Sequence, residues 1–569
     1  MRHARMSGHV VLRTASVLDP RNGKRGLKPL GLPMIPECLM ANRAQLFNDR
    51  ALKQMGVPPL ESGIDGRGIV IGFVDYGFDV LHPCFREAET GRTRFCYLWD
   101  QNSGREFDAN TIDTLINSSE QTGTRRAADA YYDPHANSYG KHGTRGGAHG
   151  TIMASIAAGS AMAGFRGVAP AADMIAVQVG LLDHHWKEEN AAGVPTWASW
   201  EPGDQPIWNG WRSYDESTQI IDAIEYVYDR ASRLGASVVV INLSIGAYSV
   251  AHDGRSSVEQ KITEIVSRGN QHSDFPCAVV VSAGNAGVEE NHFSGVAEPG
   301  KPLAFSWRMS REDVTQNKIE IWYRSDAPLD IDLRPELQAT APIRLEPGRT
   351  HPIHIGATRI GVADHAVHVR GPLSRARILL HPPFVPQHLW PPDSGELSFE
   401  IVCKAHADVR APVHAWIERD DGLANRSTLD PCDPASTLAS LAAAEGAIVV
   451  AAYDNSQSGS TPGLFPVSSL GPLPWDSSAS APHVCAPGHR IWGARSKSAG
   501  FIETSGTSAA AALTSGAVAL LMQRFAHSPE LDFARLGELL IGANRQKIWS
   551  PRFGNGAVNI AHILEEVTA

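Results

Sequence analysis

Segments typical of buried strands alternate with helical segments along most of this chain. Of all the features of the sequence, this alternation limits the possible folds most strongly. Segment 68–74 is a continuous apolar run rich in β-branched residues, as expected for a strand buried on both faces of a parallel sheet. Further strand-like segments lie at 173–179, 237–243, 278–281 and 447–452. Helical segments lie at 151–158, 220–234 and 258–267. Strands alternating with helices predict an α/β fold with a doubly wound, mainly parallel sheet.

The alternation stops between residues 301 and 423. Segments of period-two hydrophobicity replace it at 318–323, 366–370, 396–401 and 413–417, separated by proline-rich joints. Short alternating strands of this kind predict an all-β domain, either a jelly-roll or a sandwich. Because the α/β pattern resumes afterwards, we expect residues 63–300 and 424–569 to form one α/β domain, with residues 301–423 inserted within it.

Two segments lie outside these patterns. Residues 1–62 are mixed in composition, with several prolines and a modest helical stretch at 41–55, and we interpret them as an N-terminal arm or a propeptide. Residues 180–215 form a long connection that holds Trp186, Trp197, Trp200, Trp208 and Trp211. A connection of this length is usually functional or disordered, and five tryptophans argue against disorder.

Charge and composition argue against several classes of partner. The net charge of −10 is spread along the chain without a Lys/Arg run, which argues against nucleic acid as the main partner. No apolar stretch approaches the ~20 residues that span a bilayer, so we expect no membrane insertion. The seven cysteines are scattered and include no C-x-x-C pair, which favours reduced thiols over a disulfide scaffold or zinc site. Together with the lack of a signal-peptide pattern, this predicts a cytoplasmic protein. The oligomeric state stays open.

Polar residues stand at the ends of several predicted elements. Asp75 ends the first strand, Asn285 follows the strand at 278–281, and His149 precedes a helix of small residues. Ligands of open α/β sheets bind at the carboxyl ends of the strands. Taken singly, the residues have structural explanations: Asp75 and Asn285 as turn residues, and His149 as a loop histidine. Together with Ser508 they would supply an acid, a base, a nucleophile and a hydrogen-bond donor on one sheet.

Ser508 stands at the first turn of a helix that is apolar on all sides. After Gly506 and Thr507, small and apolar residues dominate the run, and no charge occurs before Arg524, so this helix is expected to be buried. A serine at this position can simply cap the helix. It also lies among unsatisfied backbone N–H groups at the positive end of the helix dipole, where a developing negative charge is stabilised.

The motifs around these residues resemble those of the subtilisin-like serine peptidases, the subtilases. Residues 75–83 resemble D-[ST]-G-I-D-x-x-H-P, 149–159 resemble H-G-T-x-V-A-G-x-I-A-G, and 506–508 match G-T-S. Further similar motifs lie at 167–170, 241–246, 282–285 and 553–559. The resemblance covers roughly residues 66–300 and 424–559. The chain departs from the usual family residues at Tyr76, Ile152, Ala509 and Ala512, none of which is a catalytic position.

The resemblance implies a serine endopeptidase that acts on polypeptide substrates. Ser508 would be the nucleophile, His149 the general base, and Asp75 the residue that orients His149. The side chain of Asn285 and the N–H of Ser508 would stabilise the oxyanion. Six residues would contact the substrate: Ser244, Ile245, Gly246, Ser282, Ala283 and Gly284. No cofactor is required and we assign no metal ligands, although subtilases often bind calcium.

Segment 93–101 and the predicted β insertion resemble the subtilase branch that includes the clostridial spore-germination peptidases. Some members of that branch have lost catalytic residues, so a catalytically silent regulatory or binding protein is the alternative. A processing peptidase dedicated to one partner protein is a third possibility. The tryptophan-rich segment either borders the substrate cleft or forms a flap packed on the insertion.

Overall fold

The structure is a computed structural model. It describes residues 49–135, 148–180, 217–269, 275–310, 317–336, 341–355, 358–380, 396–406, 408–418, 427–456, 462–475, 480–525, 539–540 and 548–566. The tryptophan-rich segment and most of the predicted N-terminal arm lie outside these residues. Of the helical stretch predicted at 41–55, the described part is helical over residues 49–54.

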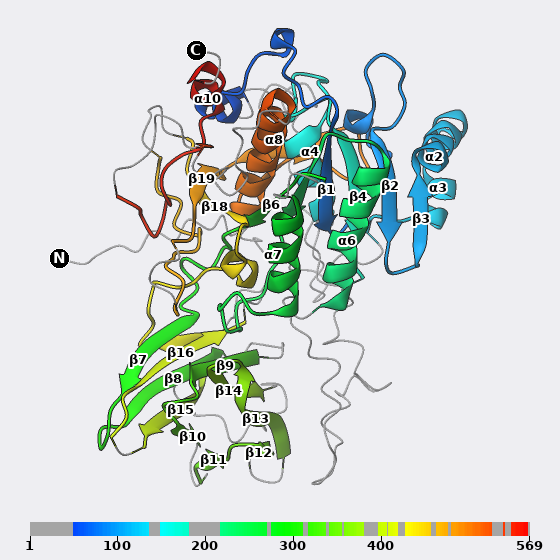
Figure 1. Ribbon diagram of the computed structural model, residues 1–569. Coiled ribbons are helices and arrows are strands. Elements are labelled where there is room, and N and C mark those ends of the chain that lie inside the picture. Colours follow the sequence, from blue (N-terminus) through cyan, green and yellow to red (C-terminus); the bar gives the residue numbers. More distant parts are fainter. Residues whose placement is uncertain are drawn as a thin grey trace, which may run out of the picture.

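An eight-stranded sheet forms the centre of the α/β domain (Figure 1), with the strand order β19-β18-β6-β5-β1-β4-β2-β3. The strands are β1 (Ile69–Asp75), β2 (Phe95–Asp100), β3 (Arg105–Asp108), β4 (Asp173–Gln178), β5 (Val238–Leu243), β6 (Cys277–Ser282), β18 (Ile448–Tyr453) and β19 (Val484–Pro487). All neighbours are parallel except the edge pair β2 and β3. The predicted doubly wound, mainly parallel sheet is confirmed.

Helices cover both faces of this sheet. On one face, α4 (His149–Ala158) and α8 (Thr507–Phe525) share a core with strand residues such as Ile71 and Val240. On the other face, α6 (Thr218–Arg233) and α7 (Ser257–Gly269) pack on the alternate strand residues, such as Val239. This alternation explains why the strands are continuous apolar runs, because both of their faces are buried.

The helix that carries Ser508 is buried on nearly all sides, as its sequence predicts. Its small residues allow close packing against its neighbours: a Cβ at Gly516 would lie 2.5 Å from Cβ of Val168 and 2.7 Å from the carbonyl oxygen of Ala157. The middle of α8 is therefore packed densely against the segments that carry Ala157 and Val168.

An all-β domain is inserted between β6 and β18, as predicted. Its strands are β7 (His292–Ala297), β8 (Leu303–Ser310), β9 (Asn317–Arg324), β10 (Leu329–Pro335), β11 (Ile343–Leu345), β12 (Arg349–Ile355), β13 (Thr358–Arg370), β14 (Leu373–Leu380), β15 (Glu396–Ala405), β16 (Ala411–Ile417) and β17 (Thr428–Asp430). They form a five-stranded sheet, β11-β10-β15-β8-β17, and a six-stranded sheet, β12-β13-β14-β9-β16-β7. One apolar core joins residues of both sheets, so the domain is a sandwich. Its first and last strands lie outside the predicted range of 301–423.

Smaller elements complete the α/β domain. These are α2 (Ala109–Thr122), α3 (Arg126–Tyr131), α10 (Ile560–Glu566), the hairpin of β20 (Ile491–Ala494) and β21 (Phe501–Thr504), and the 3-10 turns η1 (Leu60–Ser62), η2 (Pro83–Phe85) and η8 (Ser440–Ala443). Ala51 and Met55 are buried in the same core as α8, and the Met55 carbonyl accepts a hydrogen bond of 2.9 Å from Ile560 N–H. Within the described residues, no helix is long and apolar enough to cross a membrane.

Candidate active site

Asp75 and His149 form a direct side-chain pair. Asp75 is the last residue of β1 and is fully buried, while His149 is the first residue of α4. Nδ1 of His149 lies 2.8 Å from each carboxylate oxygen of Asp75. An imidazole held at Nδ1 by a carboxylate has its other nitrogen, Nε2, directed away from that carboxylate, where it can exchange a proton.

The loop after β1 holds the start of α4 in place. Gly150 N–H donates to the carbonyl of Tyr76 at 2.8 Å, and Thr151 N–H donates to that of Gly77 at 2.9 Å. These bonds satisfy two of the free N–H groups at the helix N-terminus. A Cβ at Gly150 would lie 2.7 Å from the Phe78 ring, so only glycine allows this close approach.

Tyr76, one of the departures from the usual family residues, stacks on His149. Their ring centroids are 5.3 Å apart and the ring planes differ by 23°. The Tyr76 N–H also donates to the Asp75 carboxylate at 2.7 Å. The imidazole is therefore held at its edge by Asp75 and on one face by Tyr76.

The side chain of Asn285 is hydrogen-bonded to Thr507, the residue that precedes Ser508. Its Oδ1 accepts hydrogen bonds from N–H and Oγ1 of Thr507, at 2.9 and 3.0 Å. Because a backbone N–H can only donate, the amide oxygen must face Thr507, which leaves Nδ2 as a donor on the other side. A Cβ at Gly506 would lie 3.3 Å from that nitrogen, so a side chain there would crowd the amide.

Ser508 is the second residue of α8 and is only partly buried, although its neighbours Thr507 and Ala509 are buried. A serine in the first turn is surrounded by backbone N–H groups that have no partner within the helix. The structure thus brings Asp75 and His149 into hydrogen-bond contact and places Asn285 beside the turn that carries Ser508.

Comparison with known families identifies most of the α/β domain. The sequence profile of the subtilase family matches residues 66–303 and 425–556, which is more than half of the chain. The chain belongs to the subtilase family. Membership in this family supports a serine peptidase function and polypeptide substrates.

Solved structures similar to this subtilase include the CspB protease of Clostridium perfringens. The two are 20% identical, the match covers 91% of this chain and 97% of that chain, and the TM-score is 0.67. This match shows that the two proteins share a fold. Fervidolysin from Fervidobacterium pennivorans, a keratinolytic enzyme related to subtilisin, is 16% identical over 90% of this chain and 45% of that chain, with a TM-score of 0.39. MycP1 from Mycobacterium smegmatis is 15% identical over 90% of this chain and 84% of that chain, with a TM-score of 0.38.

The two segments expected to contact the substrate leave neighbouring strands of the subtilase sheet. Ser244–Gly246 follow β5, and Ser282–Gly284 end and follow β6, which pairs in parallel with β5. The Gly284 N–H donates to Oγ1 of Thr507 at 3.1 Å, so the second segment is attached to the start of α8. Both segments therefore lie at the carboxyl ends of the parallel strands, on the same side of the sheet as Asp75.

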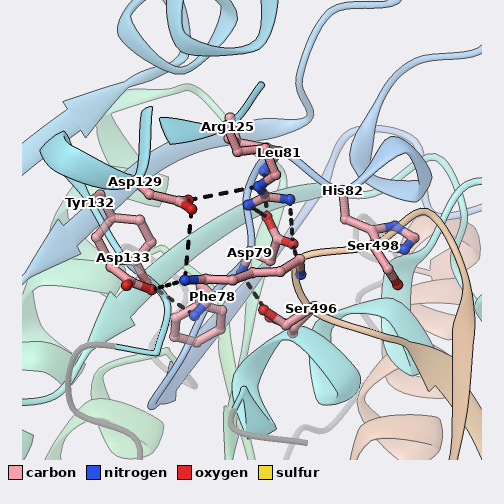
Figure 2. A network of polar contacts seen from close by, with 12 residues as sticks. Phe78, Asp79, Leu81, His82, Arg125, Asp129, Tyr132, Asp133, Ser496 and Ser498 are labelled. Carbon is pink, nitrogen blue, oxygen red and sulfur yellow. Dashed lines mark hydrogen bonds and ion pairs between the residues drawn. The ribbon is translucent and has the colours of Figure 1, made fainter. Parts of the chain in front are cut away.

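A polar network that sequence reasoning missed surrounds Asp79 (Figure 2). The buried Asp79 carboxylate accepts two hydrogen bonds from Arg125, at 2.9 and 2.5 Å, and one of 2.6 Å from Lys497 N–H. Lys497 Nζ in turn lies 2.7 Å from an oxygen of Asp133. Burial alone would lower the pKa of Arg125, but the hydrogen bonds to Asp79 raise it above its usual value. The network joins the loop after β1 to α3 and to the β20–β21 hairpin.

His82, which directly precedes the 3-10 turn η2, is a structural histidine. Its Nε2 lies 3.0 Å from the Gly500 carbonyl, and its Nδ1 accepts a hydrogen bond of 3.2 Å from Cys84 N–H. Burial lowers its pKa. Within the described part of the chain, no group of three or more His, Cys, Asp or Glu side chains is placed to hold a metal ion.

Proposed function

We propose that this subtilase is a serine endopeptidase whose nucleophile is Ser508. The observation that carries the proposal is the His149–Asp75 pair at one edge of the sheet, with Asn285 fixed beside the turn of Ser508. In this reaction Ser508 Oγ attacks the carbonyl carbon of the scissile peptide, and His149 Nε2 takes the hydroxyl proton. Asp75 holds the imidazole in position and stabilises its protonated form.

The remaining steps use the same residues. His149 returns the proton to the leaving amine, which breaks the C–N bond and leaves an acyl ester on Ser508. Water, deprotonated by His149, then hydrolyses this ester and regenerates the free enzyme. In both steps the carbonyl oxygen becomes negatively charged, and Asn285 Nδ2 and the N–H of Ser508 donate to it.

The substrate would bind in an extended conformation. We propose that Ser244–Gly246 pair with its backbone as an additional strand and that Ser282–Gly284 line the pocket for the residue before the cut. The position of both segments at the sheet edge beside α8 supports this assignment.

Reaction with a fluorophosphonate probe tests the catalytic assignment. The folded wild-type protein is expected to be labelled at Ser508, and labelling is expected to be lost in Ser508→Ala and strongly reduced in His149→Ala. Ser505→Ala, which changes an exposed serine in the same connection, is the matched control and should be labelled like the wild type. Absence of labelling in the folded wild type would instead support a catalytically silent protein.

A panel of unrelated denatured proteins tests the breadth of the activity. Cleavage of many members of the panel, abolished by Ser508→Ala, is expected of a general endopeptidase. A labelled enzyme that leaves the whole panel intact would point to a processing peptidase with one partner protein.

A further inference from the structure

The backbone N–H of Asn285, like its side chain, is held by a hydrogen bond, and its partner is a buried side chain. Asn285 N–H donates to the Tyr248 hydroxyl at 2.7 Å. Tyr248 is 7% exposed and packs with Ala286 and Ala439, so its ring lies against the segment that carries Asn285. A Cβ at Gly284 would lie 2.8 Å from the tyrosine hydroxyl, and Gly284 has φ +101. Glycine at this position therefore permits both the turn and the close approach of the tyrosine.

The backbone of Tyr248 is in turn held by the inserted domain. Tyr248 belongs to the loop after β5, and its N–H donates to Glu418 Oε1 at 3.0 Å. Ser249 adds two bonds to Glu418 Oε2, from its N–H at 3.3 Å and from its Oγ at 3.1 Å. Glu418 directly follows β16 of the sandwich. A carboxylate that accepts several hydrogen bonds from one short segment fixes that segment strongly.

These contacts form a continuous path from the insertion to the candidate oxyanion donor. Glu418 holds the backbone of Tyr248, Tyr248 holds the N–H of Asn285, and the Asn285 amide is held by Thr507 beside Ser508. A donor stabilises an oxyanion only when it stands at the correct distance, and a loose supporting shell is enough to lose that distance.

We propose that Tyr248 and Glu418 are positioning residues for Asn285, through which the inserted domain sets the rate of the chemical step. This inference rests on the proposed peptidase function. Loss of the tyrosine hydroxyl leaves the Asn285 N–H without its buried partner, so the segment 284–286 is expected to shift. Because the oxyanion forms only after substrate has bound, the effect should fall on kcat and not on KM.

The test is a double-mutant cycle with fluorescein-labelled casein as substrate. Tyr248→Phe is expected to lower kcat about 10-fold, a fraction of the roughly 10²–10³-fold lost with a whole oxyanion donor, with KM changed less than about 2-fold. In the Asn285→Ala background, the same change should lower kcat by less than about 2-fold, because the residue it positions is already absent. Glu418→Ala should also lower kcat when Asn285 is present and lower it by less than about 2-fold in the Asn285→Ala background. Glu418→Gln keeps a hydrogen-bond acceptor, so its kcat should lie between those of Glu418→Ala and the wild type.

Tyr226→Phe, on α6, is the matched control and should leave kcat unchanged. An unchanged kcat in Tyr248→Phe, or an equal loss with and without Asn285, would overturn the proposal while leaving the peptidase function intact. A crystal structure of Tyr248→Phe gives a readout that does not depend on activity. There, Asn285 is expected to move relative to Thr507, and an Asn285 in its original place would also overturn the proposal. An inactive, unlabelled wild type would count against the peptidase function itself.

Discussion

Tyr76 is the residue whose contact with His149 most distinguishes this site from the motif it resembles. The ring stack restrains the imidazole on a face that Asp75 does not touch. A stacked aromatic pair contributes about 0.5–1.5 kcal/mol, which corresponds to roughly 2–10-fold in rate if it acts on the reactive orientation of His149. If His149 is the general base of the proposed peptidase, Tyr76→Ser is therefore expected to lower kcat for casein by about that factor.

Tyr76→Phe keeps the ring and removes only the hydroxyl, so it should retain most of the wild-type kcat. If Tyr76→Phe loses as much kcat as Tyr76→Ser, the loss is caused by removal of the hydroxyl and not by removal of the ring stack. Thermal denaturation of both variants separates an effect on His149 from a general loss of stability.

At the residue scale, the sequence located the parts of the site that follow from strand ends and helix starts. Asp75 and Asn285 could be placed because parallel strands end at a common edge. Tyr248 could not, since its role depends on a contact with residue 285 that only the folded chain creates. Tyr248 lies close to the motif at 241–246, but the sequence does not indicate which group its hydroxyl contacts.

Asp79 and Arg125 connect elements that are separate in the sequence. The Asp79 carboxylate has no exposure and Arg125 is 26% exposed, so this pair is shielded from solvent much more than a surface pair. Asp79→Asn removes the charge that compensates Arg125 and is expected to lower the free energy of unfolding by about 2–3 kcal/mol, below the range for fully buried pairs because Arg125 is partly hydrated.

Urea denaturation of the purified variant measures this loss. Asp229→Asn is the matched control, because Asp229 pairs with Arg233 on the exposed surface of α6, where the two side chains are 51% and 66% exposed. That variant should change the free energy of unfolding by less than about 0.5 kcal/mol. Equal effects in the two variants would mean that the network in Figure 2 is not a special source of stability.

The elements that escaped sequence reasoning are those with weak hydrophobic patterns. In α2, Ile112 and Ile116 are the buried positions and the rest of the helix is mostly polar, so a helical period is hard to recognise. By contrast, β5 and β6 are mainly apolar and fully buried, and the structure places them within a residue of the predicted bounds. The hydrophobic pattern of an element is therefore easy to recognise where the element is buried on both faces, and weak where the element lies at the surface of the molecule.

At the scale of the whole molecule, a group of three histidines, of which His252 and His292 are buried and His414 is partly buried, lies where the sandwich meets the α/β domain. His292 Nε2 lies 3.0 Å from His414 Nδ1, and both rings stack on Trp416. His252, from the loop after β5, lies against the same tryptophan, with ring centroids 4.6 Å apart. Burial lowers the pKa of His252 to about 4 and also lowers the pKa values of His292 and His414.

This junction should make the protein sensitive to acid. In the unfolded chain these histidines titrate near pH 6.5, whereas in the folded chain they stay neutral to lower pH. Below about pH 6.5 the unfolded state therefore binds more protons, so stability is lost as the pH falls from 6.5 toward 4. At pH 5 the loss is expected to be on the order of 1–2 kcal/mol for each histidine.

Melting temperatures at pH 7 and pH 5 test this expectation. The decrease between the two should be smaller in His252→Gln than in the wild type, because the variant has no group to protonate at that position. His354→Gln, which changes an exposed histidine of β12, should behave like the wild type. A His252→Gln variant with the full wild-type decrease would show that acid acts elsewhere in the molecule.

The insertion between β6 and β18 also sets the order in which the molecule can be completed during synthesis. β6 pairs with β18 through Val280 and Ile448, so the central sheet stays open until the ribosome has produced the whole sandwich. The α8 helix, which fills one face of that sheet, is made later still. A growing chain therefore carries Asp75, His149 and Asn285 well before Ser508. If Ser508 is the nucleophile, a ribosome-bound chain cannot cut its neighbours until nearly all of it has been translated.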